Sequence, residues 1–131
     1  QGLINNKCSK NIDLQITTNL TIIDDTILQL LEHFRKIVIT ISMDGIEEVG
    51  EYIRFPLNWK TFNNNVDKLI QQKHIYTAVN VTKCQLNAEH ISTLLDWCKD
   101  KDILIEPLME SDLMFSNPNF FSTKESLNAT K

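Results

Sequence analysis

Glycine, proline and cysteine are scarce in this sequence, with 3 of each among 131 residues. Because glycine and proline mark turns and loops, their scarcity predicts a chain built mostly from regular elements. The cysteines, Cys8, Cys84 and Cys98, are odd in number and far apart, which excludes the disulfide framework of a small secreted domain. We therefore expect three reduced thiols in a cytoplasmic protein.

Long apolar runs and an excess of positive charge are also missing. No apolar stretch approaches the ~18 residues that span a bilayer, and the first residues lack the pattern of a signal peptide. The 13 Lys and Arg against 17 Asp and Glu give a net charge of −4. This balance argues against nucleic acids and anionic membranes as partners. With 42% hydrophobic residues, the chain has the composition of one soluble globular domain.

Four short runs have the composition of β-strands: residues 13–18 (DLQITT), 37–42 (IVITIS), 75–82 (IYTAVNVT) and 103–106 (ILIE). The second run is almost continuously β-branched and apolar, which is typical of a strand buried on both faces. A helical pattern follows each of the first three runs. This alternation predicts an α/β protein, βαβαβαβ, whose right-handed crossovers join one parallel sheet.

The helices are expected from caps and from apolar spacing. The first follows a cap at Asp24 or Asp25, and its apolar face is Ile27, Leu30, Leu31 and Phe34. The second covers about residues 59–71. The third follows a cap at Asn87, with an apolar face of Ile91, Leu94, Leu95 and Cys98. Residues 45–58 are interpreted as a long connection, and residues 110–131 show no steady period.

Four parallel strands make an incomplete architecture. A closed (β/α)8 barrel needs eight strands and ~250 residues, and doubly wound sheets usually have about five or more strands. Either the chain is a small open sheet, or neighbouring strands lie outside it. Since the sequence begins at Gln1 rather than Met, we expect a piece of a longer protein. The exposed edge of its first strand would pair with another copy, giving a homo-oligomer.

Polar side chains follow the carboxyl end of every predicted strand, where parallel α/β proteins bind ligands. They are Thr17, Thr18, Asn19, Ser42, Asp44, Asn80, Thr82 and Glu106. Hydroxyls, amides and carboxylates suit a polar small molecule, although the same residue types are common in turns and caps. No glycine-rich phosphate loop, CxxC or HExxH motif is present. We therefore predict no metal ligands and no catalytic nucleophile with its base.

Two of these segments together resemble a known family. DLQITTNLT is a strand that ends in Thr-Thr-Asn, and IVITISMDGIEEVGEYIR is a strand followed by Ser-x-Asp-Gly and, later, an Arg. This order is similar to the middle of a radical S-adenosylmethionine (AdoMet) enzyme of the twitch or SPASM branch, over residues 11–108. The resemblance implies that residues 1–109 form strands three to six of an incomplete (β/α)6 TIM-like barrel. Residues 110–131 would be a tail or the start of an extension.

The resemblance also implies a set of AdoMet-binding residues. Asn19 would lie at the barrel mouth, and Ser42 matches a polar residue that contacts the AdoMet ribose or carboxylate. Asp44 would bond AdoMet or substrate, and Asn80 would face AdoMet from the next strand. Arg54 is the candidate for the methionyl carboxylate, because a guanidinium fork fits two oxygens.

The sequence departs from the family in one decisive way. The CxxxCxxC loop, which holds a 4Fe–4S cluster, and the Gly-Gly-Glu-Pro segment are absent, and both would precede Gln1. The three cysteines are too far apart to replace the loop. We therefore expect the chain alone to be inactive and to bind no cofactor, while the whole protein would cleave AdoMet reductively and act on an unknown small molecule or peptide. The alternative is a self-contained, non-catalytic α/β binding or interaction module.

Overall fold

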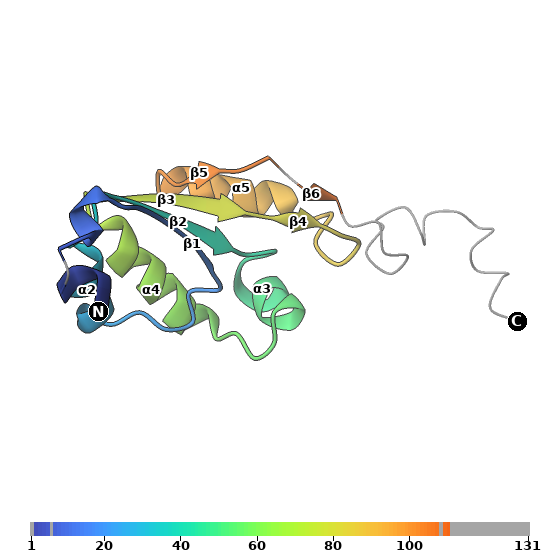
Figure 1. The fold of residues 1–131 in the computed structure, drawn as a ribbon. Coiled ribbons are helices and arrows are strands. Elements are labelled where there is room, and N and C mark those ends of the chain that lie inside the picture. Colours follow the sequence, from blue (N-terminus) through green and yellow to red (C-terminus); the bar gives the residue numbers. More distant parts are fainter. Residues whose placement is uncertain (1, 6, 108, 111–131) are drawn as a thin grey trace, which may run out of the picture.

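The computed structural model describes residues 2–5, 7–107 and 109–110, and its centre is one parallel sheet (Figure 1). The sheet has the order β1-β2-β3-β5, and every neighbouring pair is parallel. Its strands are β1 (Asp13–Thr18), β2 (Lys36–Ser42), β3 (Ile75–Asn80) and β5 (Leu104–Ile105). A second parallel pair joins β4 (Thr82–Lys83) to β6 (Met109–Glu110). The predicted α/β class and parallel strand order are confirmed.

Helices connect these strands. They are α1 (Gly2–Asn5), the 3-10 helix η1 (Ser9–Asn11), α2 (Asp25–Leu31), α3 (Glu47–Ile53), α4 (Trp59–Ile70) and α5 (Ile91–Asp100). The second predicted helix is confirmed as α4, but α3 lies within the predicted connection. Its N-cap, Ile46, makes no side-chain cap hydrogen bond, and Gly50 lies inside the helix. A short helix without a cap residue leaves little pattern in the sequence from which it could be predicted.

Two other predictions about helices are corrected. In α2, Asp24 is the cap and accepts from the N–H of Ile27 at 2.8 Å, but the buried side chains are Leu28 and Leu31, with Ile27 38% exposed. The predicted apolar face is confirmed at Leu31 and wrong at Ile27, whose place toward the core is taken by Leu28. The helix ends at Leu31, and Phe34 packs against the core from beyond it. In α5 the N-cap is His90, and Asn87 lies in the preceding turn.

The hydrophobic core lies on one face of the sheet. Ile37, Ile39 and Ile41 of β2 are at most 3% exposed and belong to one buried cluster with side chains of α2, α4 and α5. Since successive strand residues point to opposite faces, the other face carries Val38, Thr40 and Ser42.

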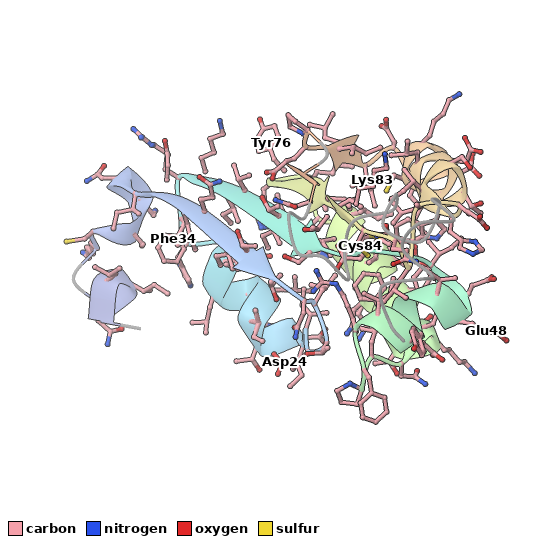
Figure 2. The ribbon with its side chains drawn as sticks, turned by 90° about the vertical axis from the view of Figure 1, so that its right-hand side faces the viewer. Asp24, Phe34, Glu48, Tyr76, Lys83 and Cys84 are labelled. Atoms are coloured by element: carbon pink, nitrogen blue, oxygen red, sulfur yellow. The ribbon has the colours of Figure 1, made fainter. Side chains whose placement is uncertain are left out.

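That second face is open within the described part of the chain. Tyr76 and Leu104 are 59% and 69% exposed there. Figure 2 shows Tyr76 above the sheet and Asp24, beside α2, below it. Thr40 is nevertheless 2% exposed, so β2 is close to buried on both faces at its centre, as its sequence predicts. No helix among the described residues is long and apolar enough to cross a membrane.

Candidate functional site

The carboxyl ends of β2, β3 and β5 bring three polar residues into one row. Ser42 is the register partner of Asn80, and the N–H of Glu106 donates to the carbonyl of Val79 at 2.9 Å. Because this bond continues the pairing of β3 with β5, Glu106 lies beside Asn80 at the edge of the sheet. Parallel strands thus gather these side chains where α/β proteins bind ligands.

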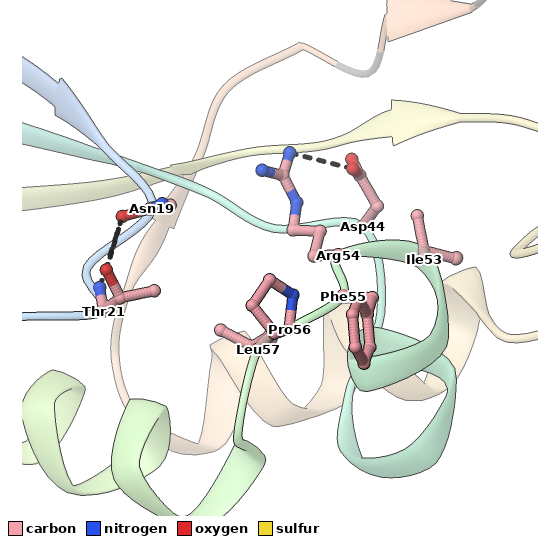
Figure 3. Close-up of a pocket in the computed structure, with 8 residues that line it drawn as sticks. All are labelled: Asn19, Thr21, Asp44, Ile53, Arg54, Phe55, Pro56 and Leu57. Carbon is pink, nitrogen blue, oxygen red and sulfur yellow. Dashed lines mark hydrogen bonds and ion pairs between the residues drawn. The ribbon is translucent and has the colours of Figure 1, made fainter.

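Asp44 and Arg54 form a partly buried ion pair beside this row. An Arg54 Nη2 atom lies 2.8 Å from Asp44 Oδ2, and the two side chains are 28% and 13% exposed (Figure 3). Asp44 Oδ1 also accepts from the N–H of Thr82 at 2.9 Å. The sequence predicts both residues as ligand contacts, and the structure gives each a protein partner. Arg54 Nε is buried without a hydrogen-bond partner, so the ion pair with Asp44 does not satisfy every guanidinium donor.

Two glycines set the position of Arg54. A Cβ atom on Gly50 would lie 2.5 Å from the carbonyl oxygen of Gly45, closer than real Cβ contacts. Their contact holds α3 against the loop that follows β2. The N–H of Arg54 then donates to the carbonyl of Gly50 at 3.0 Å and ends the helix. The Asp-Gly turn and α3 therefore place Arg54 opposite Asp44.

The loop after β1 forms the opposite wall. Asn19 Oδ1 accepts from the N–H of Thr21 at 3.3 Å and from its hydroxyl at 3.0 Å (Figure 3). From α4, the buried Asn65 amide donates to the carbonyls of Leu20 and Thr21 at 2.9 and 3.2 Å. Asn19 therefore shapes its own turn, and Asn65 anchors that turn to the helix layer.

A cavity of about 440 Å³ lies between these walls. Its lining includes Asn19, Asp44 and Arg54, together with the apolar side chains of Ile53, Pro56 and Leu57 (Figure 3). The structure therefore brings three of the five predicted ligand residues to one cavity. Ser42 and Asn80 lie outside its lining, on the row of strand ends.

Two residues at this edge have roles that the sequence does not reveal. Asn80 Nδ2 donates to Glu106 Oε2 at 3.2 Å, so Asn80 is already bonded to a carboxylate. Asn87, 1% exposed, accepts from the N–H of Cys84 and donates to the carbonyls of Asp44 and Thr82 at 2.8–2.9 Å. The sequence predicts Asn87 as a helix cap, because asparagine is a common cap residue and its bonds to main-chain groups of neighbouring loops leave no separate signal in the sequence.

The described residues do not fit an iron–sulfur cluster. Cys8 is exposed, Cys84 is half-buried after β4, and Cys98 is buried in α5. Burial raises the pKa of the Cys98 thiol to about 11, which disfavours the thiolate that a cluster needs. Within the described residues, no group of three or more His, Cys, Asp or Glu is arranged to hold a metal ion.

The same edge has the features of a site for a polar small ligand. Arg54 lines a cavity of about 440 Å³, a volume within the usual range for small-molecule sites. Asn19, Asp44 and Arg54 are the polar groups beside its apolar walls, and Ser42 and Glu106 lie on the neighbouring row of strand ends. Polar groups that converge beside apolar walls are typical of small-molecule sites.

Comparisons with known proteins identify a fold and no family. No protein-family model matches the chain, and no curated protein matches it. Among solved structures, His-tagged anSMEcpe with bound AdoMet gives a TM-score of 0.64 at 18% identity. Native anSMEcpe with bound AdoMet gives 0.61 at 16% identity, and its complex with AdoMet and the Cp18Cys peptide gives 0.60 at 16%.

These matches cover 78% of this chain, which spans only 30–31% of the anSMEcpe chain. That protein is an anaerobic sulfatase-maturating radical SAM enzyme. At this level of identity the likeness concerns architecture alone. The four-stranded parallel sheet and its helices match part of a radical SAM TIM-like barrel.

Proposed function

We propose that this chain forms strands three to six of a radical SAM barrel and supplies one side of its AdoMet site. The proposal rests on one observation: the strand ends, the Asp44–Arg54 pair and a cavity lie at the same edge of this fold. The CxxxCxxC loop would be supplied by a preceding segment. The whole protein would then cleave AdoMet reductively to start radical chemistry, and this chain alone would be inactive.

Each residue has a defined part in this proposal. Arg54, which lines the cavity, donates to a carboxylate oxygen of AdoMet with guanidinium N–H groups that Asp44 does not take, while Nη2 stays paired with Asp44. Ser42 bonds the ribose or carboxylate from the end of β2. Asn19 and Asp44 chiefly hold the two loops that enclose the cavity. Asn80 acts through Glu106, which its amide positions.

The test uses the whole protein encoded by the source gene, purified without oxygen and with its cluster reconstituted. AdoMet binding is measured by equilibrium dialysis, and 5′-deoxyadenosine is measured after reduction. Arg54→Lys keeps the charge but removes the fork, so we expect affinity to fall about tenfold or more, the equivalent of roughly 1.4 kcal/mol. Arg35→Lys is the matched control, because Arg35 is exposed and pairs with Asp13 at the amino end of β1. No AdoMet binding, or equal binding by Arg54→Lys, contradicts the proposal.

The open edge of β1 supports a second part of the proposal, self-association. The outer backbone groups of β1 have no strand partner among the described residues, because β1 ends the sheet order. Such edges pair with other strands. We expect the 131-residue chain to form a homo-oligomer in light scattering after size exclusion. A monomer at high concentration would favour the self-contained module instead.

A further inference from the structure

Glu106 is held in place by two neutral donors. Its Oε1 accepts from the hydroxyl of Thr40 at 3.0 Å, and its Oε2 accepts from the amide of Asn80 at 3.2 Å. Thr40 is 2% exposed, so its hydroxyl is a fixed part of the sheet. The half-buried carboxylate therefore has a defined orientation, with one hydrogen bond on each oxygen.

This orientation does not neutralise the charge. Among the described residues, no ion pair joins Glu106 to a cation. Arg54 is paired with Asp44, and Lys36 lies over the ring of Tyr76 towards the amino ends of the strands. A partly buried carboxylate without a counter-ion favours the binding of a cation.

Glu106 also keeps acceptor capacity for a ligand on both of its carboxylate oxygens. A carboxylate has about four acceptor positions, and Thr40 and Asn80 each take one. Each oxygen therefore keeps acceptor capacity, and a guanidinium is a cation that can donate to both carboxylate oxygens with two parallel hydrogen bonds. A protonated amine can use the same oxygens singly.

We propose that Glu106 binds a cationic N–H group of the substrate, a guanidinium or a protonated amine, at the carboxyl ends of β2, β3 and β5. The inference rests on the proposed function only in taking this edge as the ligand site. The substrate class follows from the net charge of the site. The Asp44–Arg54 pair is neutral overall and Glu106 adds one negative charge, so the site attracts a cation. Thr40 and Asn80 are positioning residues that fix the carboxylate.

The test uses the full chain and a small probe, methylguanidinium chloride, titrated at millimolar concentration. N-methylurea is the neutral control of the same shape. Binding is followed by NMR at the side-chain amide of Asn80, which contacts Glu106 directly. We expect saturable shifts with methylguanidinium and none with N-methylurea. Raising the salt concentration should weaken binding, because salt screens charge–charge attraction.

Two variants separate the charge of Glu106 from general effects. Glu106→Gln keeps the shape and should lower the affinity for methylguanidinium at least tenfold. Glu48→Gln, on the exposed side of α3 (Figure 2), should leave it unchanged. Equal binding of N-methylurea, salt-independent binding of the wild-type chain, or unchanged affinity in Glu106→Gln would each overturn the proposal. The salt series uses the wild-type chain and remains decisive if Glu106→Gln does not fold.

A separate measurement distinguishes this inference from the proposed function. AdoMet binding and 5′-deoxyadenosine formation by the whole protein test the radical SAM assignment, and methylguanidinium binding tests Glu106. If the probe binds through Glu106 while the whole protein binds no AdoMet, the cation site stands and the enzyme assignment fails. If the whole protein binds AdoMet but the probe does not bind through Glu106, the radical SAM assignment stands and only the proposed substrate class fails.

Discussion

Asn87 holds together the loops on which the candidate site depends. Removing its side chain tests how much its hydrogen bonds stabilise the fold. The residue is 1% exposed, and its amide makes three hydrogen bonds to main-chain groups of Cys84, Asp44 and Thr82. Asn87→Ala leaves a buried N–H and two carbonyls without these partners. At about 1 kcal/mol for each bond, the expected loss of unfolding free energy is about 3 kcal/mol.

The assay is urea unfolding followed by far-UV circular dichroism. With a slope of about 1–3 kcal/mol/M, a loss of this size lowers the midpoint by about 1–3 M. Asn87→Asp separates hydrogen bonding from packing, because it keeps the volume but replaces the donor of two bonds by an acceptor. We expect Asn87→Asp to be at least as unstable as Asn87→Ala, since a charge is also buried.

Asn64→Ala on α4 is the matched control, because Asn64 is exposed and alanine favours helices. Its midpoint should be unchanged or slightly higher. A loss of less than about 0.5 kcal/mol in Asn87→Ala, the lower end for one hydrogen bond, would contradict the stabilising role of these three bonds. A neutral Asn87→Asp would show that packing, rather than the three bonds, sets the role of this residue.

Three further predictions concern helix packing, a buried thiol and a surface ion pair. Gly50→Ala should lower the urea midpoint despite the better helix propensity of alanine, because its Cβ would lie 2.5 Å from a main-chain oxygen. Gly2→Ala is the control: its Cβ meets no atom within 4 Å, so the midpoint should not fall. Burial raises the pKa of the Cys98 thiol from an ordinary 9.0 to about 11, so stability should fall as pH rises from about 9 to 11. Cys98→Ala should flatten that fall in urea unfolding. The hydrogen bond from Arg35 lowers the pKa of Asp13, so Arg35→Gln should raise it in an NMR titration, and an unchanged pKa would contradict this cause. The stabilising effect of that lowered pKa is present above the ordinary carboxyl pKa and is lost as pH falls.

The sheet could be predicted because its information is local. The run at 37–42 is β-branched and apolar, and the structure places β2 at Lys36–Ser42 in the centre of the sheet. The helix predicted at about 59–71 is α4, whose cap Asn58 accepts from the N–H of Thr61 at 2.9 Å. Periodicity and caps are properties of neighbouring residues, so a single sequence displays them.

The site could be predicted only in part because its contacts are long-range. The parallel order places polar residues at one edge, but it does not pair them. That Arg54 bonds Asp44, or that Asn80 bonds Glu106 across 26 positions, depends on how α3 and β5 pack. The sequence around Asn87 predicts a helix cap, whereas in the structure its side chain bonds to main-chain groups of three residues. Side-chain pairing between distant segments has no local signature.

That this chain is part of a radical SAM barrel is a claim that sequencing the source DNA upstream of the codon for Gln1 can test. The fold matches only part of such a barrel, so we expect an in-frame segment that encodes CxxxCxxC and then Gly-Gly-Glu-Pro shortly before Gln1. A start codon within a few residues of Gln1 would contradict the claim and favour a self-contained α/β binding module.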